Sequence, residues 1–407
     1  MKIWLINHYA VPPQYYPLAR PSLFAKNLIK MGHDVTIIAA STVHNSDKNL
    51  IEGNDKVKKF MDDGIPYILV KCSDYQGNGI KRVVNILEFA RKLPGVLKIL
   101  DQPDAIIATS FDPLSCYVGI KYAKKHGIRA VAEIADLWPE TLVQYNNVSP
   151  YNPIVLYLRN IEKNIYQKAD SIVFTAAGEY NYIIEQGWQK DIPKEKVYYI
   201  NNGIDLELFD YNREHFITQD SELDDEKLFK VVYTGSIRKV NDVGGILNVA
   251  KEVNNPRIRF LIWGDGDELL MLKKRAEEEG IRNVSFKGRV EKKYVPYIVS
   301  KADLNYAHNQ PSPLFKYGIS FNKIFDYLAA GKPILCDFPC KYNPVLMGKA
   351  GVSVDSANPK EIAQQIDAFA EINQTIYQSY CRAARSTSEE YEFKILTKKL
   401  LSAIDQI

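Results

Sequence analysis

Apolar residues along this chain alternate between short unbroken runs and stretches with helical spacing. The clearest helical stretch, residues 320–333, carries apolar side chains at i, i+3, i+4, i+7 and i+8, at Phe321, Ile324, Phe325, Leu328 and Ala329. We expect Ser320 to cap the start of this helix, Gly331 to end it in the left-handed conformation, and Pro333 to prevent its continuation. The run at 334–337 then predicts a short buried strand.

The rest of the chain repeats this alternation. Apolar runs that predict strands lie at residues 2–7, 35–38, 65–70, 104–110, 129–134, 170–175, 197–200, 230–234, 259–263, 284–290 and 302–306. Helical spacing lies at residues 80–100, 113–125, 154–168, 372–384 and 388–405. We expect Pro94-Gly95 to break the first of these helices, and residues 41–64 to form a polar loop with a short helix. Alternating strands and helices predict an α/β protein, and the second series predicts a second doubly wound sheet.

An acid-rich stretch separates the two series. Residues 211–227 are polar, and their second half carries Asp220, Glu222, Asp224, Asp225 and Glu226. Such a stretch is expected to be solvated rather than packed. We therefore expect an N-terminal domain over residues 1–210, a linker over 211–227 and a C-terminal domain that begins at residue 228.

Length and composition narrow the class of protein. A chain of 407 residues with 46% hydrophobic and 25% charged residues is long enough for two domains with full cores. The net charge of +3 gives no strong case for a nucleic-acid partner. The five cysteines are scattered, and Cys336 and Cys340 lack a matching Cys or His pair, so we expect no metal site. Because we find no signal peptide and no apolar run of membrane-span length, we expect reduced thiols and a cytoplasmic location.

The polar residues of the helix at 320–333 suit an anionic ligand. Its first turn has free backbone N–H groups and the positive end of the helix dipole, and Lys323 adds a full charge there. Asp326 lies one turn further on, where a carboxylate can accept two hydrogen bonds from a sugar diol. Phosphate at the helix start and ribose one turn along is the layout that a nucleotide sugar needs. The alternative is that Lys323 and Asp326 form a solvated i,i+3 pair, worth only a few tenths of a kcal/mol.

This helix resembles the donor-binding helix of the retaining glycosyltransferases of family 4. Asp326 stands where that family has the second of two Glu residues, and the segment at 328–333 matches the family's residues after that Glu. Gly318 stands in the place of the first Glu, and Lys323 is expected to carry part of its role. Residues 320–323 resemble the Ser-Pro-Asn-Lys variant of a subgroup that builds bacterial surface polysaccharides such as O-antigen and capsule.

Residues 32–38 and 201–209 are similar to two further segments of the same family. The resemblance implies the GT-B fold, in which two doubly wound Rossmann-like domains face a central cleft. The N-terminal domain would bind the acceptor, and the C-terminal domain, over residues 228–385, would bind the nucleotide sugar. The last helix, over residues 386–407, would return to pack on the N-terminal domain.

The resemblance also implies roles for residues of the C-terminal domain. Lys323 and Arg238, with the helix dipole, would stabilise the diphosphate as it leaves, and no metal or other cofactor would be required. The nucleotide, expected to be UDP, would lie against Gly235, Ser236, Lys239, Gly264, Arg289, Val290 and Asp326. The loop of Ser320, Phe321 and Asn322 would meet the donor sugar and its phosphate.

Polar residues of the N-terminal domain are the candidates on the acceptor side. Asp136 follows the strand at 129–134, and α/β proteins place their sites at the carboxyl ends of parallel strands. Asp136 is therefore an acid/base candidate, and the alternative is that it caps the following turn. His8 and Arg20 are expected to face the cleft. The alternative for His8 is a hydrogen-bonded histidine at the end of a strand.

These features predict a retaining glycosyltransferase that moves a hexosyl or N-acetylhexosaminyl unit to a glycan or a polyprenyl-diphosphate-linked acceptor. The sugar, the linkage and the acceptor would depend on the loops at residues 8–20, 136–150 and 308–320. Three alternatives stay open: a GT-B-fold sugar-nucleotide epimerase, a nicotinamide-dependent oxidoreductase and a non-catalytic partner of another transferase. The missing Gly-x-Gly-x-x-Gly after the first strand argues against the oxidoreductase.

The predicted helix at residues 80–100 has a basic and an apolar side. Its cations, set against the single acid Glu88, are Lys81, Arg82, Arg91, Lys92 and Lys98. Such a helix can lie on an anionic membrane surface. It would bring a chain without a membrane span to a lipid-linked acceptor at the inner face of the cell membrane. The alternative is a solvated helix face.

Overall fold

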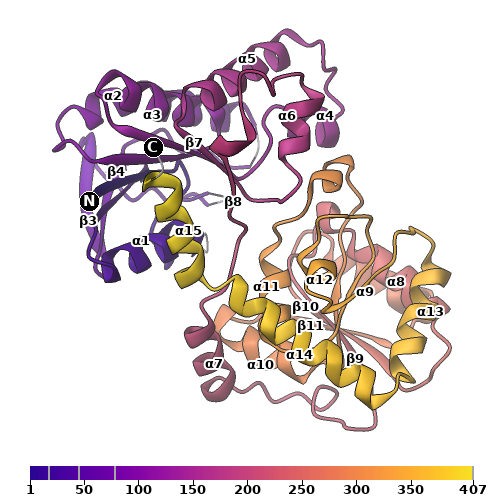
Figure 1. The fold of residues 1–407 in the computed structure, drawn as a ribbon. Helices are drawn as coiled ribbons and strands as arrows, with labels where there is room; N and C mark the ends of the chain where they lie inside the picture. Colours follow the sequence, from indigo (N-terminus) through magenta and orange to yellow (C-terminus); the bar gives the residue numbers. More distant parts are fainter. Residues whose placement is uncertain (17–18, 45, 78, 406–407) are drawn as a thin grey trace. The chain divides into compact units, whose positions relative to one another are not determined.

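The computed structural model describes residues 1–16, 19–44, 46–77 and 79–405, which form two compact units, each built on its own sheet (Figure 1). The first unit joins Met1–Asn201 to the C-terminal stretch from Phe393, and the second unit is Asn202–Glu392. Pro17 and Leu18 of the expected acceptor loop lie outside the described residues. The two sheet-based units confirm the predicted α/β class.

The strands of the first unit form a sheet in the order β3-β4-β2-β1-β5-β6-β7-β8. Neighbouring strands are parallel, except that β3 and β4 form an antiparallel pair at one edge. The strands are β1 (Lys2–Ile6), β2 (Asp34–Ala40), β3 (Val57–Asp62), β4 (Ile65–Val70), β5 (Ala105–Thr109), β6 (Arg129–Ile134), β7 (Ser171–Phe174) and β8 (Val197–Tyr199). Helices cover both faces, which explains the near-continuous apolar runs of the central strands.

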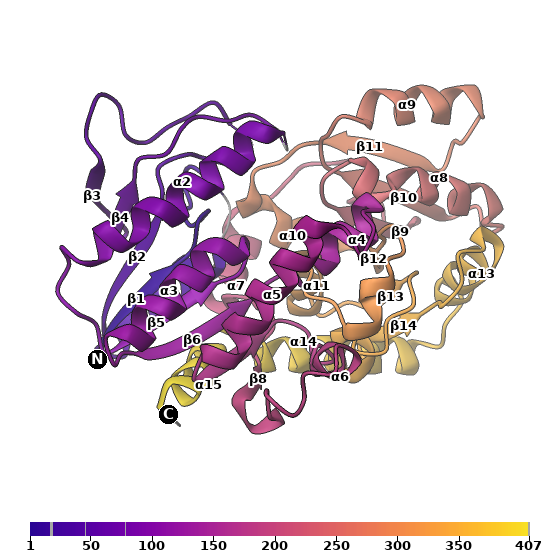
Figure 2. The same ribbon diagram turned by 90° about the horizontal axis from the view of Figure 1, so that it is seen from above.

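Three helices lie side by side on one face of this sheet (Figure 2): α2 (Ile80–Leu97), α3 (Pro113–Lys125) and α5 (Pro153–Lys168). The other face carries α1 (Ala19–Lys30) and α15 (Phe393–Asp405) (Figure 1). Three short helices complete this unit: α4 (Glu140–Asn146) after β6, α6 (Tyr180–Glu185) after β7, and η1 (Lys194–Lys196) before β8. Phe393 and Leu400 of α15 are buried in the core of the first unit, where the Phe393 and Phe24 rings lie 5.2 Å apart. This is the expected return of the last helix.

The second unit has a parallel sheet in the order β11-β10-β9-β12-β13-β14. The strands are β9 (Phe229–Thr234), β10 (Ile258–Trp263), β11 (Val284–Gly288), β12 (Leu304–Ala307), β13 (Ile334–Cys336) and β14 (Gly351–Ser353). One face packs against α8 (Val243–Glu252), α9 (Leu269–Glu278) and α13 (Pro359–Ala370). The opposite face packs against α10 (Val295–Lys301) and α11 (Asn322–Ala329), with α14 (Gln374–Glu390) beside α11. The remaining short elements are α7 (Leu206–His215), η2 (Lys239–Asn241), η3 (Lys292–Tyr294), η4 (Pro313–Tyr317) and α12 (Pro344–Met347).

Two local predictions were wrong. In place of the short helix expected within 41–64, the described residues of that segment form a loop and the strand β3, whose backbone is satisfied by pairing with β4. Pro94-Gly95 does not break α2, which continues to Leu97. Leu93, Val96 and Leu97 are buried around that point, and their packing outweighs the backbone hydrogen bond that a proline cannot donate.

The division between the units also differs from the expected boundaries at 210, 227 and 385. The chain joins the second unit directly after residue 201, since the Asn202 side chain donates to the Ser320 carbonyl at 2.8 Å. The acid-rich stretch is packed only in part, since Asp224 and Glu226 are exposed to solvent as expected. Lys287 pairs with Asp220 at 2.7 Å and with Glu222 at 2.8 Å, and Leu223 is fully buried. Charge pairing within the unit therefore replaces hydration of Asp220 and Glu222 alone.

Candidate functional site

The loops that follow the strands of the second unit meet at one side of its sheet, at the carboxyl ends of the strands. We call this side the strand-end edge. Chain order reverses between β9 and β12, and ligands of open α/β sheets bind at such a switch point, beyond the carboxyl ends of the strands. The residues that come directly after these strands are Gly235, Gly264, Arg289, His308 and Asp337. The sheet order therefore brings together residues that lie up to about a hundred positions apart in the sequence.

Two glycines are required where the loops after β9 and β10 touch. A Cβ on Gly264 would lie 1.8 Å from the carbonyl oxygen of Gly235, and a Cβ on Gly266 would lie 2.1 Å from that of Ile237. Any side chain at these positions would push the two loops apart. The Gly-Asp-Gly turn therefore keeps backbone against backbone at this edge, as expected where a chain must approach closely.

Lys323 lies in the first turn of α11, and its ammonium group contacts residues from other parts of the same unit. The Lys323 Nζ donates to the Tyr233 hydroxyl at 3.2 Å and to the His308 carbonyl oxygen at 3.1 Å. It also lies 4.4 Å from the centre of the Tyr233 ring. Burial lowers the pKa of Lys323 to about 8, while Asp337 acts in the opposite direction. These contacts fix a cation beside the start of a helix.

His308 forms the second charged centre of this edge. Its Nδ1 contacts the Asp337 carboxylate, and its Nε2 lies 2.6 Å from the carbonyl oxygen of Asp242. The Tyr306 hydroxyl donates to the same Asp337 oxygen at 2.6 Å. Burial works to lower the pKa of His308, but Asp337 outweighs it, and the net effect is a raised pKa. A Cβ on Gly245 would lie 2.8 Å from the imidazole, so this ring also needs a glycine beside it.

Asp326 is nearly buried and has a partner that the sequence analysis did not include. Its carboxylate forms an ion pair with Lys292, which belongs to η3 and has a side chain that is 67% exposed. The solvated pair of Lys323 with Asp326, considered as the alternative, is therefore wrong, because the two side chains bond elsewhere. One turn of α11 still places the carboxylate beyond Lys323, as the predicted layout requires.

The other predicted donor residues occupy the same loops with different exposure. Ser236, Arg238, Lys239 and Arg289 are exposed, and Val290 is half-buried against the core. Ser320 does not cap α11: Phe321 holds the cap position without a side-chain hydrogen bond, and the Ser320 hydroxyl accepts from Asn202 N–H at 3.1 Å. Asn322, the first residue of α11, is exposed.

Asp136 lies after β6 in the first unit, at the carboxyl end of that strand. Its side chain has exposed surface, yet the surrounding protein removes enough water to raise its pKa to about 6, against the effect of the Arg82 guanidinium. The following helix, α4, begins at Glu140 with Pro139 in the cap position, so Asp136 does not cap it. A carboxyl with a pKa near neutrality suits transfer of a proton.

His8 follows β1 and is buried. Its Nε2 lies 2.7 Å from the Asn85 side-chain oxygen, and its Nδ1 lies 3.4 Å from the Asp112 carboxylate. The Asn85 amide group donates to Thr42 and to the Ser73 carbonyl, so its oxygen must accept from His8. This geometry favours a hydrogen-bonded histidine at the end of a strand over a residue that binds the acceptor substrate.

Arg20, which was expected to face the cleft, is held by groups of the first unit. Its guanidinium donates to Glu133 at 2.9 Å, to the Asn201 carbonyl at 2.6 Å and to the Ile200 carbonyl at 2.8 Å. Only 7% of the residue is exposed. The charge of Glu133 and two carbonyl groups after β8 explain why a cation is stable there, and they give Arg20 a structural role within the first unit.

Comparison with known proteins gives one family match over most of each unit. Residues 23–208 match Glycosyltransferase Family 4, and residues 215–386 match Glycosyl transferases group 1. This chain belongs to the GT-B glycosyltransferases. TuaH of Bacillus subtilis (strain 168), a glycosyltransferase assigned to teichuronic acid biosynthesis, is 27% identical over 216 residues. That match spans 51% of this chain and 50% of the relative, about half the length of each.

Solved structures share the fold over the whole chain. HepE of Anabaena, in complex with UDP, has a TM-score of 0.69 at 14% identity, with 100% of both chains covered. Sucrose-phosphate synthase of Thermosynechococcus elongatus has a TM-score of 0.72 at 14% identity, covering 100% of this chain and 98% of that one. A glycosyltransferase from Rickettsia africae ESF-5 has a TM-score of 0.64 at 15% identity, with the same coverage. The structural similarity establishes the GT-B fold, and at identities this low it establishes neither the donor nor the acceptor.

Within this GT-B glycosyltransferase, sequence reasoning missed three buried groups of the strand ends: His308, Asp337 and Glu179. Glu179 follows β7 and accepts from the Ala176 N–H at 3.0 Å, and burial raises its pKa well above the usual value. Each lies at the end of a predicted apolar strand or within a few residues after it, which is the signal that selected Asp136. Applied to every strand, that rule would have found His308 and Asp337.

Among the described residues, no group of three or more His, Cys, Asp or Glu side chains could hold a metal ion. No helix in the described part of the chain combines the length and apolar character needed to cross a bilayer.

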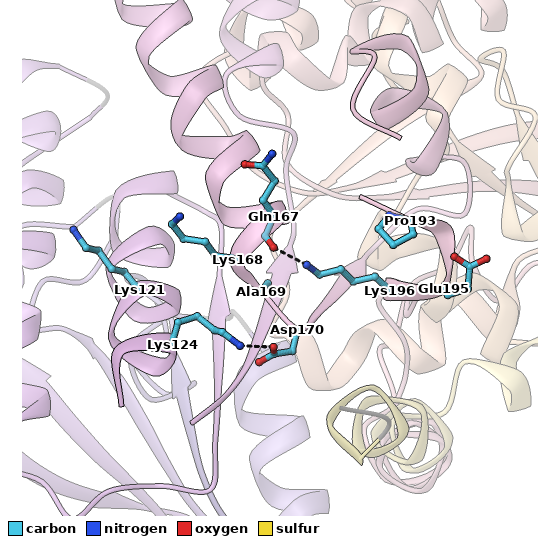
Figure 3. A pocket seen from close by; sticks show the side chains of 9 residues that line it. All are labelled: Lys121, Lys124, Gln167, Lys168, Ala169, Asp170, Pro193, Glu195 and Lys196. Atoms are coloured by element: carbon cyan, nitrogen blue, oxygen red, sulfur yellow. Dashed lines mark hydrogen bonds and ion pairs between the residues drawn. The ribbon is translucent and has the colours of Figure 1, made fainter. Parts of the chain in front are cut away.

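A basic hollow of about 680 Å³ lies in the first unit, at the amino ends of the strands of its sheet (Figure 3). Its lining residues are Lys121, Lys124, Gln167, Lys168, Ala169, Asp170, Pro193, Glu195 and Lys196. These residues precede β7 and β8 or belong to α3 and α5, so the hollow lies at the amino ends of the strands. Lys124 pairs with Asp170, and Lys196 donates to the Gln167 carbonyl at 2.8 Å. The hollow is therefore separate from the strand ends that carry Asp136.

Proposed function

We propose that this protein is a retaining glycosyltransferase that moves a hexosyl or N-acetylhexosaminyl unit from a nucleotide sugar to a glycan or lipid-linked acceptor. The observation that carries the proposal is the Lys323 ammonium group, fixed at the start of α11 beside the switch point of the sheet. A helix start with a lysine in its first turn favours a diphosphate. The GT-B family supports the reaction class.

The chemistry follows from where charge develops. The bond between the anomeric carbon and the diphosphate oxygen breaks, a bond to the acceptor oxygen forms on the same face, and the electron pair leaves with the diphosphate. Lys323, the exposed Arg238 and the dipole of α11 would stabilise that growing charge, which stabilises the transition state more than the bound donor. Asp326 would accept hydrogen bonds from the ribose, and Asp136 would take the proton of the acceptor hydroxyl.

UDP is proposed as the nucleotide, and a bacterial surface polymer as the product. HepE, which shares the fold, is solved with UDP and with UDP-glucose, and TuaH is assigned to teichuronic acid biosynthesis. No cofactor or metal is proposed to take part, since cations and amide groups would balance the diphosphate. The protein is proposed to act at the inner face of the cell membrane, where the exposed surface of α2 would bind.

The test is a thermal-shift screen with UDP-, GDP- and ADP-sugars, because a bound donor raises the unfolding temperature by mass action. The donor that binds is then incubated alone and with a membrane extract. Transfer only in the extract, with the anomeric configuration of the donor kept in the product, supports the proposal. Conversion of the donor alone would indicate the epimerase, and binding without turnover would indicate a non-catalytic partner. Inverted configuration would contradict retention.

A further inference from the structure

Three ionisable groups lie close together at the carboxyl ends of the strands of the second unit. The sum of their charges decides how strongly this edge attracts an anion. Lys323 is a cation, Asp337 follows β13, and His308 lies between Asp337 and the backbone of Asp242. With a neutral His308, the lysine and the carboxylate would sum to zero. With an imidazolium, one positive charge remains. The protonation state of His308 therefore fixes the net charge of this edge.

The contacts of His308 fix a proton on Nε2 and favour a second proton on Nδ1. The carbonyl oxygen of Asp242, 2.6 Å from Nε2, can only accept, so Nε2 carries a proton. Nδ1 meets the Asp337 oxygen that already accepts from the Tyr306 hydroxyl, as expected of an ionised carboxylate. With a proton on both nitrogens, the ring pairs with Asp337 as an imidazolium, and the residue is only 6% exposed. Both ring nitrogens contact groups of the second unit, so the ring acts through its neighbours.

Asp337 has spare capacity to bind a cation. Its Oδ1 is buried and has no hydrogen-bond partner among the described residues. A carboxylate in that condition attracts any nearby cation, and Lys323 feels its charge. The Lys323 Nζ bonds instead to the His308 carbonyl oxygen at 3.1 Å. One residue thus neutralises the carboxylate with its ring and holds the lysine with its backbone.

We infer that His308 is a positioning residue that neutralises Asp337 and so leaves the charge of Lys323 for the diphosphate of the donor. Only the identity of the anion rests on the proposed function; the charge relation among the three side chains does not.

Anion binding beside Lys323 should therefore depend on pH. Titratable or charged groups around His308 come from every neighbouring element: Asp337, Tyr306, Asp242, Lys323, Tyr233 and Cys336. The pKa of His308 is raised, so the imidazolium is present at low pH and lost as pH rises through that value. Lys323 loses its charge as pH rises through about 8. Both changes weaken anion binding in the alkaline direction.

The test compares His308→Gln, Asp337→Asn and the double variant with the parent protein. UDP affinity is measured by calorimetry at neutral pH, and the pKa of Lys323 by NMR titration of ¹³C-labelled lysine. His215→Gln, at an exposed histidine of the same unit, is the matched control. We expect His308→Gln to weaken UDP binding about tenfold or more and to raise the pKa of Lys323, because the free carboxylate draws on the lysine. The double variant removes both opposing charges and should restore UDP affinity to within about threefold of the parent.

A merely structural role gives a different pattern: the double variant would bind UDP as weakly as His308→Gln, or worse. That result, or an unchanged Lys323 pKa in His308→Gln, would overturn the inference. Nitrogen NMR of the parent protein supplies a test without any substitution, because a neutral His308 at neutral pH would also overturn it. If the parent binds no nucleoside diphosphate, the proposed function fails, while the two NMR measurements still decide the charge relation.

Discussion

At the scale of single residues, Asp326 illustrates how one carboxylate can serve the fold and a ligand. Lys292 bonds to its Oδ2, and this lysine is largely exposed, so it can move when a ligand arrives. A ribose diol can then use the same face of α11 that the spacing from Lys323 predicts. The role of Asp326 in holding ribose stays a prediction until nucleotide binding is measured.

Asp326→Ala is expected to weaken binding of the free nucleoside diphosphate, because up to two hydrogen bonds to a charged acceptor are lost, at about 1.5–3 kcal/mol each at most. Calorimetry on the folded variant measures the change. Glu277→Ala, at an exposed acid on α9, is the control and should bind like the parent. Unchanged affinity in Asp326→Ala would remove the ribose assignment.

Asp136 gives a second prediction at this scale. Its pKa is raised to about 6, so the carboxylate form that can take a proton is populated only above that pH. Turnover in the parent should therefore rise with pH through about 6. Asp136→Asn should lose most of the turnover together with this acidic limb, while nucleoside diphosphate binding by the second unit stays intact. A pH–rate profile checks both points, and an acidic limb that persists in Asp136→Asn would exclude this carboxylate as the base.

At the scale of elements, the structure changes the description of α2. Arg82 bonds to the Tyr9 hydroxyl at 3.0 Å, and Lys92 bonds to the Lys71 carbonyl at 2.8 Å, so neither is a free surface cation. Phe89 is buried. The outward face instead carries Ile80, Lys81, Val83, Val84, Leu87 and Arg91. This mixture of exposed apolar and basic side chains still suits an anionic membrane surface.

We predict that the protein sediments with anionic vesicles at low salt and is released at high salt, since each exposed cation near the surface is worth about 1 kcal/mol. Replacing Lys81, Arg91 and Lys98 by Gln, with Leu87→Ser, should abolish sedimentation and leave nucleotide binding unchanged. The control is Lys273→Gln with Lys274→Gln on α9, where both lysines are exposed. If the α2 variant sediments like the parent, the helix is only a solvated face.

At the scale of the whole molecule, the chain leaves the first unit after residue 201 and rejoins it at residue 393. The first unit therefore depends on α15, whose Leu396 and Leu400 are buried in its core. An element supplied from the far end of the sequence closes one face of the first sheet. Stability of the first unit is thus linked to a helix that comes after the entire second unit.

Leu400→Ala should destabilise the first unit by about 2–5 kcal/mol, because it leaves a cavity beneath the sheet. Ile395→Ala, on the same helix but 37% exposed, is the matched control and should cost much less. Denaturant unfolding monitored by circular dichroism measures both variants. Nucleoside diphosphate binding should be retained in Leu400→Ala, because the predicted nucleotide residues belong to the second unit. Loss of binding would contradict this prediction.

Local signals in the sequence were enough to identify many of the elements. Unbroken apolar runs identified the central strands of both sheets, and helical spacing identified α3, α5 and α11, because burial is recorded within a few residues. Gly331 ends α11 with a φ of 63°, as its position predicts. The position of Lys323 in the first turn also came from spacing alone.

The partners of those residues depend on tertiary structure. Ser320 turns to Asn202, Arg20 is held by Glu133, and His308 meets Asp337, contacts that span 118, 113 and 29 positions of sequence. The physical reason is that a strand's apolar pattern states that it is buried but not which strand lies beside it. Sheet order brings the end of β12 next to the end of β13, and that neighbourhood fixes the charge left on Lys323.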